Sequence, residues 1–186
     1  MGIIKRILLT CGLALAAALV VMFMIYVYPW LVLWLGLSMM PNPPKPEITY
    51  GEFPFELVYE LDGEIKVVKD VLICEFDGFN LNTGRGKNRQ WKTRTESGED
   101  RITLLYSEGI EIFFPSGTDK GDLYMGDPET HAEDVEHPFP NAYYNTPPVN
   151  GIHNSSYIIS AEDMWEKYSL KLISWKPSQP IQNSFK

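Results

Sequence analysis

Residues 55–73 read FELVYELDGEIKVVKDVLI, and their pattern decides the fold class of the chain. Apolar and polar residues alternate in two short runs, one on each side of Asp62-Gly63. Alternation with a period of two is typical of a strand with one buried face, and Asp-Gly between two such runs is a strong hairpin signal. The stretch therefore predicts a pair of antiparallel strands.

The register of this hairpin depends on the length of its turn. A two-residue turn would pair Tyr59 with Lys66, whereas a three-residue loop at 61–63 would pair Tyr59 with Ile65. Because a shift of one residue moves every side chain to the other face, the choice decides which side chains share a face. The three-residue loop keeps apolar side chains together, and we predict that register.

More segments with strand-like composition follow at short intervals. Turn residues, among them Gly78, separate them, and the connections are too short for helical crossovers. We predict an antiparallel meander, sandwich-like or barrel-like, whose further strands lie at 72–76, 89–95, 101–106, 110–114, 122–126 and 170–175. Residues 127–151 show no period and predict a long irregular excursion. Ser160 is typical of a helix cap, and residues 161–168 predict one short C-terminal helix.

The N-terminal segment carries the strongest signal of another kind. Residues 7–40 contain no charged side chain, and a membrane-spanning helix needs about 20 apolar residues. The run is too short for two spans with a turn and too long for a cleaved signal sequence, so we predict one uncleaved transmembrane helix over residues 7–28. Pro29 is expected to kink or end it. Residues 30–40 would then continue as a tilted extension or lie along the membrane surface.

The flanking sequences predict how this anchor is oriented and joined to the rest of the chain. Lys5 and Arg6 precede the apolar run and Lys45 follows it, which favours a cytoplasmic N-terminus and an external C-terminal domain. Residues 41–48 read PNPPKPEI and are typical of a semi-rigid spacer. We therefore predict a single-pass cell-membrane protein with an anchor at 1–40, a proline-rich spacer at 41–48 and a β-rich extracytoplasmic domain at 49–186.

Composition excludes several classes of protein. The chain has 24 acidic against 16 basic residues, which argues against a nucleic-acid partner, because phosphate binding needs a basic surface. Its two cysteines, Cys11 in the apolar run and Cys74 beyond it, exclude a disulfide scaffold and a four-thiolate zinc site. We interpret Cys74 as a small buried residue rather than a nucleophile. No cofactor is predicted.

Four blocks of sequence are distinctive: PEITYGEFPF at 46–55, ICEFDGF at 73–79, YMGD at 124–127 and LKLISW at 170–175. They resemble those of an uncharacterised family of small membrane-anchored or lipoprotein-like extracytoplasmic proteins from Gram-positive anaerobic bacteria. The resemblance extends over nearly all of residues 46–186 and implies an anchored domain outside the cytoplasm, with no known activity. The chain departs from the family in its longer apolar N-terminus.

A basic stretch, TGRGKNRQWKTR at 83–94, is the first candidate site. Its glycine spacing and the absence of a hydroxyl residue after Lys87 exclude a Walker-type phosphate loop. Its cations could bind lipid headgroups, another anionic envelope component or a protein partner, or could pair with the nine acidic residues between 121 and 166. We expect Trp91 to point into the core. The five cations are Arg85, Lys87, Arg89, Lys92 and Arg94.

A second candidate is a metal site formed by His131, Glu133 and His137, whose side chains are of the kinds that bind zinc. The spacing matches neither the H-E-x-x-H motif nor a calcium loop, so an exposed acidic loop is the simpler interpretation. The sequence predicts a membrane-anchored binding or envelope-associated structural domain. The alternative is a metal-assisted or carboxylate-based hydrolase with its site around residues 119–153. The motifs G-x-S-x-G, C-x-x-C and S-x-x-K are absent from the sequence, which favours a protein that is not an enzyme.

Overall fold

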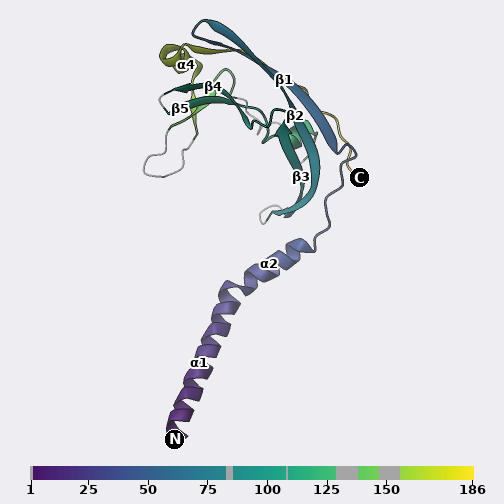
Figure 1. Ribbon diagram of the computed structural model, residues 1–186. Helices are drawn as coiled ribbons and strands as arrows, with labels where there is room; N and C mark the ends of the chain where they lie inside the picture. The colour runs from purple at the N-terminus through teal and green to yellow at the C-terminus, as the bar shows by residue number, and fades with distance from the viewer. Residues whose placement is uncertain (1, 83–85, 108, 129–137, 147–155) are drawn as a thin grey trace. The chain divides into compact units, whose positions relative to one another are not determined.

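The computed structural model describes residues 2–82, 86–107, 109–128, 138–146 and 156–186 (Figure 1). Contacts divide the chain into two compact units. The first unit comprises residues 1–43 and 79–89, and the second comprises residues 44–78 and 90–186.

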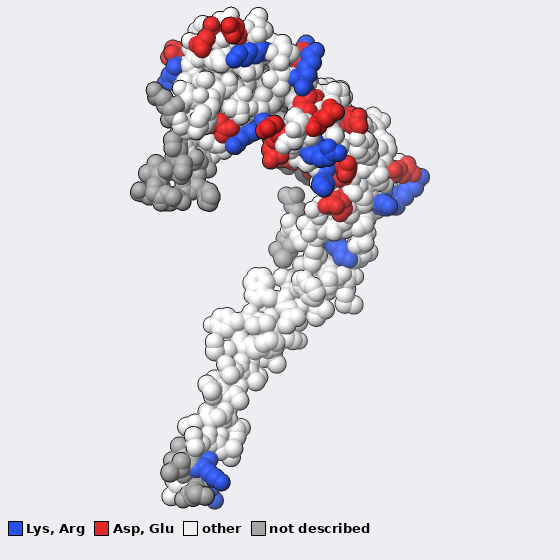
Figure 2. All heavy atoms as spheres, in the orientation of Figure 1, with Lys and Arg blue, Asp and Glu red and all other residues white. Residues whose placement is uncertain are grey.

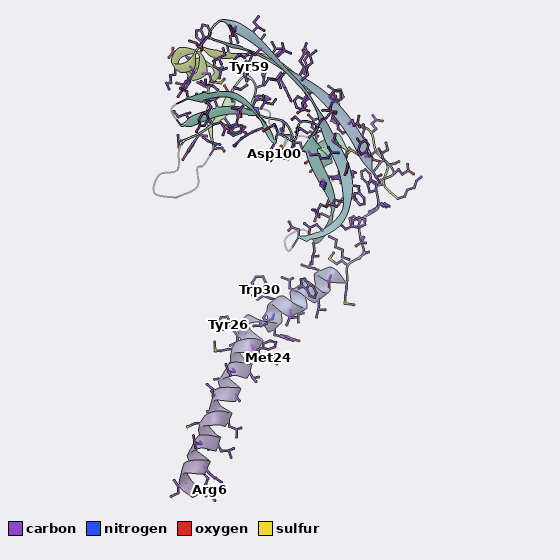
Figure 3. All side chains as sticks on the ribbon, viewed as in Figure 1. Arg6, Met24, Tyr26, Trp30, Tyr59 and Asp100 are labelled. Carbon is purple, nitrogen blue, oxygen red and sulfur yellow. The ribbon has the colours of Figure 1, made fainter. Side chains whose placement is uncertain are left out.

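The first unit contains the predicted apolar helix. Helix α1 (Gly2–Tyr26) includes a segment of 19 residues, Leu8–Tyr26, that is long and apolar enough to cross a membrane, with none of it buried inside the protein. Its side chains, Met24 and Tyr26 among them, project outward all around the helix (Figure 3). Lys5 and Arg6 lie near its start, and the rest of the helix carries no charge (Figure 2). The prediction of one N-terminal apolar helix is confirmed.

A short second helix, α2 (Tyr28–Ser38), follows after a break at Val27. The Val27 N–H still donates to the Phe23 carbonyl at 2.9 Å, but Pro29 has no N–H to offer to the preceding turn. Proline is tolerated in the first turn of a helix, where its missing donor is not needed, and it stands there in α2. The prediction that the helix is interrupted at Pro29 is confirmed.

The rest of the chain is mainly antiparallel β-structure, as predicted. One four-stranded sheet has the order β3-β2-β1-β8 and the other has the order β4-β5-β6-β7. The first consists of β1 (Tyr50–Leu61), β2 (Glu64–Asn82), β3 (Gly86–Thr95) and β8 (Leu170–Lys176). The second consists of β4 (Arg101–Ser107), β5 (Ile110–Pro115), β6 (Ala142–Asn145) and β7 (Tyr157–Ile159). Each sheet contains a meander, and β8 returns to pair with the free edge of β1.

Side chains from both sheets form one hydrophobic core in the second unit. Leu57 of β1 and Phe114 of β5 are both fully buried in it, and Trp175 of β8 packs between Phe55 and Phe114 with ring centroids about 5 Å from each. Helix α4 (Ala161–Tyr168) contributes the fully buried Met164. Ser160 caps this helix by accepting a hydrogen bond from the Asp163 N–H at 3.1 Å, which confirms the predicted short C-terminal helix.

The register predicted for the first hairpin is wrong. The turn has two residues, so Tyr59 pairs with Lys66 and Leu61 with Glu64. Asp62 and Gly63 both have positive φ, 53° and 82°, as a type I′ turn requires, and this turn matches the twist of the flanking strands. Its favourable geometry outweighs the burial of Ile65, which is left 68% exposed.

Three further expectations are corrected by the structure. Residues 122–126 are not a strand, because Gly121–Tyr124 form the short helix α3, and Tyr124 and Met125 are both buried, which alternation in a strand does not allow. Gly78 is not in a turn but inside β2, which continues through it with φ of 90°. The excursion at 127–151 contains the short strand β6, and β7 was also missed.

A C-terminal segment fastens the start of the β-rich part. Phe185 forms a bridge with Pro46, and Lys45 and Lys186 exchange main-chain hydrogen bonds of 2.8 and 3.0 Å. Glu47 forms an ion pair with Lys186 and accepts a hydrogen bond from Ser184. The second half of the predicted spacer is therefore tied to the folded domain and is not a free linker.

Candidate functional site

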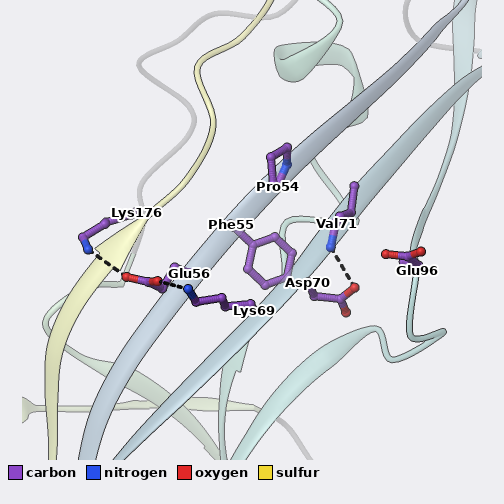
Figure 4. Close-up of a pocket in the computed structure, with 8 residues that line it drawn as sticks. All are labelled: Pro54, Phe55, Glu56, Lys69, Asp70, Val71, Glu96 and Lys176. Atoms are coloured by element: carbon purple, nitrogen blue, oxygen red, sulfur yellow. Dashed lines mark hydrogen bonds and ion pairs between the residues drawn. The ribbon is translucent and has the colours of Figure 1, made fainter.

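A shallow groove of about 430 Å³ lies where β1, β2 and β8 meet (Figure 4). The register explains its charged side chains, because Glu56 of β1 is paired with Lys69 of β2 on one side and Lys176 of β8 on the other. The three residues thus form a row across three strands. The residues lining the groove are Pro54, Phe55, Glu56, Lys69, Asp70, Val71, Glu96 and Lys176.

Glu56 forms ion pairs with both lysines of this row. Its Oε1 lies 2.7 Å from Lys176 Nζ and its Oε2 lies 3.0 Å from Lys69 Nζ. The hydrogen bonds from Lys176 and then Lys69 hold the pKa of Glu56 below its ordinary value of 4.5. The carboxylate is therefore ionised at neutral pH and is not suited to exchange protons as a general acid.

Asp70 forms the opposite side of the groove and has a structural task. Its Oδ1 accepts hydrogen bonds from the N–H groups of Val71 at 2.7 Å and Ser97 at 3.3 Å. Its Oδ2 accepts from the Ser97 hydroxyl at 2.5 Å. These bonds fix the turn after β3, so the Asp70 carboxylate is already committed to the fold.

Pro54 marks the place where the groove opens beside β1. The last β1–β8 pair is Glu56 with Lys176, so Pro54 lies beyond the end of that ladder. Proline is tolerated in a sheet where no partner strand needs its N–H. The chain leaving β8 stays close, because the Ser178 hydroxyl donates to the Pro54 carbonyl at 2.6 Å.

The groove combines an apolar wall with exposed charged groups. Pro54 and Val71 provide the apolar wall. The side chains of Lys69 and Lys176 are 71% and 68% exposed. The groove residues include neither a hydroxyl nor a thiol that could act as nucleophile. The exposed ammonium groups can therefore contact an anionic group of a ligand beside the apolar wall, while the carboxylates of Glu56, Asp70 and Glu96 line the same groove.

The predicted basic stretch is spread over different environments. Arg89 is 7% exposed, Lys87 is half-buried, and Lys92 and Arg94 are exposed. Arg85 lies outside the described residues. Arg94 pairs with Glu75 of β2 at 3.6 Å, and this partner lies outside the acidic region at 121–166.

Trp91 does reach that acidic region. Its indole Nε1–H donates to Asp127 Oδ2 at 3.1 Å, and Asp127 is 6% exposed. Its ring meets Phe76 nearly edge-on, with centroids 5.4 Å apart, and the residue packs against the hydrophobic core. The expectation that Trp91 points inward is confirmed. A partly buried indole that packs on the core and donates its N–H to a carboxylate stabilises the fold.

The predicted metal-binding residues His131, Glu133 and His137 all lie outside the described residues. Within the described part of the chain, no group of three histidine, cysteine or acidic side chains is placed to hold a metal ion. Cys74 is fully buried, and this burial, with a smaller effect of Asp122, raises its pKa to about 12. A thiol with that pKa is protonated at neutral pH, in agreement with its interpretation as a core residue.

Sequence reasoning did not single out the groove. Glu56 and Lys69 would have been found opposite each other if the two-residue turn had been chosen, because that register pairs them. Lys176 could not have been added, since it lies 120 residues from Glu56.

Comparison of the chain with protein-family models, with curated proteins and with solved structures found no match.

Proposed function

We propose that the protein is anchored in the cell membrane by α1, and that its β-rich domain acts outside the cytoplasm as a binding or structural component of the cell envelope. The observation that carries this proposal is the segment Leu8–Tyr26, a wholly unburied apolar helix of membrane-spanning length. Such a surface would be strongly unfavourable in water, whereas lipid accommodates it. The resemblance to anchored extracytoplasmic proteins stays a prediction and points the same way.

The orientation follows from the charges beside the span. Lys5 and Arg6 precede it, and no basic residue follows it until Lys45. Positive charges are retained preferentially on the cytoplasmic side, so the N-terminus is assigned to the cytoplasm and the β-rich domain to the outside.

Thiol labelling in intact cells tests this topology. In a Cys11→Ala background, with Cys74 buried, single cysteines replace the exposed residues Ile3 and Glu64, one on each side of the span. We expect a membrane-impermeant maleimide to label Glu64→Cys in intact cells and Ile3→Cys only after permeabilisation. The reverse pattern contradicts the orientation. Release of the protein from membranes by alkaline carbonate contradicts the anchor itself.

The groove is the ligand site that this function assigns to the domain. We propose as its ligand an anionic envelope component, such as a polyphosphate-containing wall polymer, that binds the exposed ammonium groups of Lys69 and Lys176 in competition with Glu56, beside the apolar wall at Pro54 and Val71. We expect the double variant Lys69→Gln/Lys176→Gln to lose binding to purified wall polymer. The matched control is Lys66→Gln/Lys171→Gln, which removes two exposed lysines of the same strands outside the groove. Equal losses in both variants would show only a general effect of charge.

A further inference from the structure

Helix α2 has an apolar surface that water would not favour. None of its residues is charged and none is buried, and Trp30 is 67% exposed (Figure 3). Its large side chains face outward on every side, so it has no polar face of the kind that a helix on the surface of a soluble domain needs. A helix that is apolar all around is normally surrounded by nonpolar material.

The span before it leaves no room for α2 to continue in the same direction. At 1.5 Å per residue, the 19 residues of Leu8–Tyr26 extend about 28 Å, close to the thickness of about 30 Å of a bilayer core. The 11 residues of α2 would add about 16 Å. A straight continuation would therefore carry most of α2 out of the hydrocarbon and into water.

The break between the helices allows another course. Val27 and Pro29 interrupt the run, so α2 is free to take a direction different from that of α1. Tyr28, Trp30 and Trp34 lie in α2, and tyrosine and tryptophan favour the headgroup boundary, where the ring is in apolar surroundings and its polar atom is hydrated.

The chain itself covers only the far end of α2 in the part that the structure describes. Leu37 and Ser38 are half-buried, and the Met40 sulfur lies 3.5 Å from the position that a Cβ on Gly86 would occupy. Gly86 belongs to the same unit as the helices. Residues 30–35 are left exposed, and it is their surface that needs another nonpolar environment.

We propose that α2 is embedded in the membrane leaflet on the side of the β-rich domain, close to parallel with the membrane plane, and that phospholipid is what covers its apolar surface. The proposal rests on the proposed function, since it needs α1 to span the bilayer. Lipid is the proposed covering because α2 continues directly from the span and because residues 7–40 contain no charged side chain. In this position the whole uncharged segment is placed within a bilayer of ordinary thickness.

Nitroxide scanning of the full chain tests this placement. Single cysteines from Trp30 to Leu37, in a Cys11→Ala background, are spin-labelled in vesicles of phosphatidylcholine with a minor share of phosphatidylglycerol. Depth is read from collisions with oxygen and with a water-soluble nickel chelate. We expect depths that repeat about every 3.6 residues without a net trend, and a steady change of about 1.5 Å per residue would overturn the proposal.

Two other results would also overturn it, and one control separates its failure from that of the anchor. Strong collision with the nickel chelate at every position would place α2 in water. Protection from both reagents would place it in a protein contact, such as one with a second copy. Ala14 and Ala18 in α1 serve as depth references, and aqueous readings there would contradict the proposed function instead.

The proline supplies a matched pair of variants. Pro29→Ala restores the missing N–H and allows α1 and α2 to join, so we expect it to introduce a depth gradient along α2. Pro43→Ala changes a proline beyond the end of α2 and should leave the depths unchanged. If the depths are the same in both variants and show no trend, the break at Pro29 does not set the direction of α2, and this part of the proposal is wrong.

Discussion

The side chain of Asn183 binds both main-chain groups of Ile48. Its Oδ1 accepts from the Ile48 N–H at 3.0 Å, and its Nδ2 donates to the Ile48 carbonyl at 2.8 Å. The same Nδ2 lies 3.2 Å from the Met125 carbonyl. One amide therefore joins the segment that enters β1, the end of α3 and the C-terminal segment, and it holds together three parts of the chain that are distant in sequence.

Replacing Asn183 with alanine should destabilise the β-rich domain. The substitution removes four hydrogen bonds, one of them from the Ser184 N–H, and leaves main-chain groups of Ile48, Met125 and Ser184 without this partner. We therefore expect a loss of about 1–3 kcal/mol. Urea unfolding of the full chain in detergent, followed by tryptophan fluorescence, measures the change. Asn80→Ala is the control, because Asn80 is exposed and its side chain bonds only to the neighbouring Leu81 N–H among the described contacts. Equal losses in the two variants would contradict a special role for Asn183.

Gly126 allows the C-terminal segment to lie against the end of α3. It has φ of 65°, and a Cβ added there would lie 2.3 Å from the Ile181 carbonyl oxygen. Gly98 has a similar φ of 83°, but a Cβ there would meet nothing within 4 Å. The two glycines thus differ in crowding and share the same backbone requirement.

We expect Gly98→Ala to cost about 1 kcal/mol from backbone strain alone, and Gly126→Ala to cost clearly more. The extra cost arises because alanine at 126 must push the C-terminal segment away, so its peptide bonds should also become sensitive to protease. Denaturant unfolding and limited proteolysis of the two full-length variants provide the comparison. Similar stability and similar cleavage in both would show that the segment does not depend on the contact.

The elements that the sequence predicted well are those coded by local patterns. The apolar run gives α1, Pro29 gives the break, Ser160 gives the cap of α4, and Asp62-Gly63 gives the first hairpin. The register was missed because burial and turn geometry favoured different pairings, and the turn determined the outcome. Residues 122–126 were wrongly predicted to be a strand, because the periodicity of so short an apolar segment cannot distinguish a strand from one turn of helix.

The candidate site was less predictable than the fold because its residues meet only through long-range pairing. Glu56 and Lys176 are 120 residues apart, and Ser178 is 124 residues from Pro54. No local pattern reports such contacts. The basic stretch, by contrast, was conspicuous in sequence, but alternation along β3 placed Arg89 in a buried position and Lys92 in an exposed one.

Glu56 should make the stability of the domain depend on pH in the acid range. Its folded pKa lies below its ordinary value of 4.5, so its contribution is fully present above about pH 4.5 and is lost as pH falls through the lower folded pKa. We expect Glu56→Gln to be less stable than the unmodified chain at pH 6, and the difference to shrink below pH 4.5. Unfolding midpoints measured across this range check the expectation.

Glu99→Gln is the control for this titration, because Glu99 is exposed and belongs to none of the ion pairs between described residues. If the difference in stability between Glu56→Gln and the unmodified chain stays constant at every pH measured, the two lysine contacts do not stabilise the ionised form of Glu56.

Cys74 should be unreactive in the folded chain. Cys74 is fully buried, and this burial raises its pKa to about 12, so the thiol is protonated near neutral pH. In detergent at pH 8, and in the Cys11→Ala variant, which removes the thiol inside the proposed span, we expect a chromogenic disulfide reagent to titrate Cys74 only after denaturant is added. In the Cys11→Ala variant, no thiol should react before unfolding. Rapid reaction of Cys74 in that folded variant would show an accessible thiolate, and would reopen the possibility that this residue acts as a nucleophile.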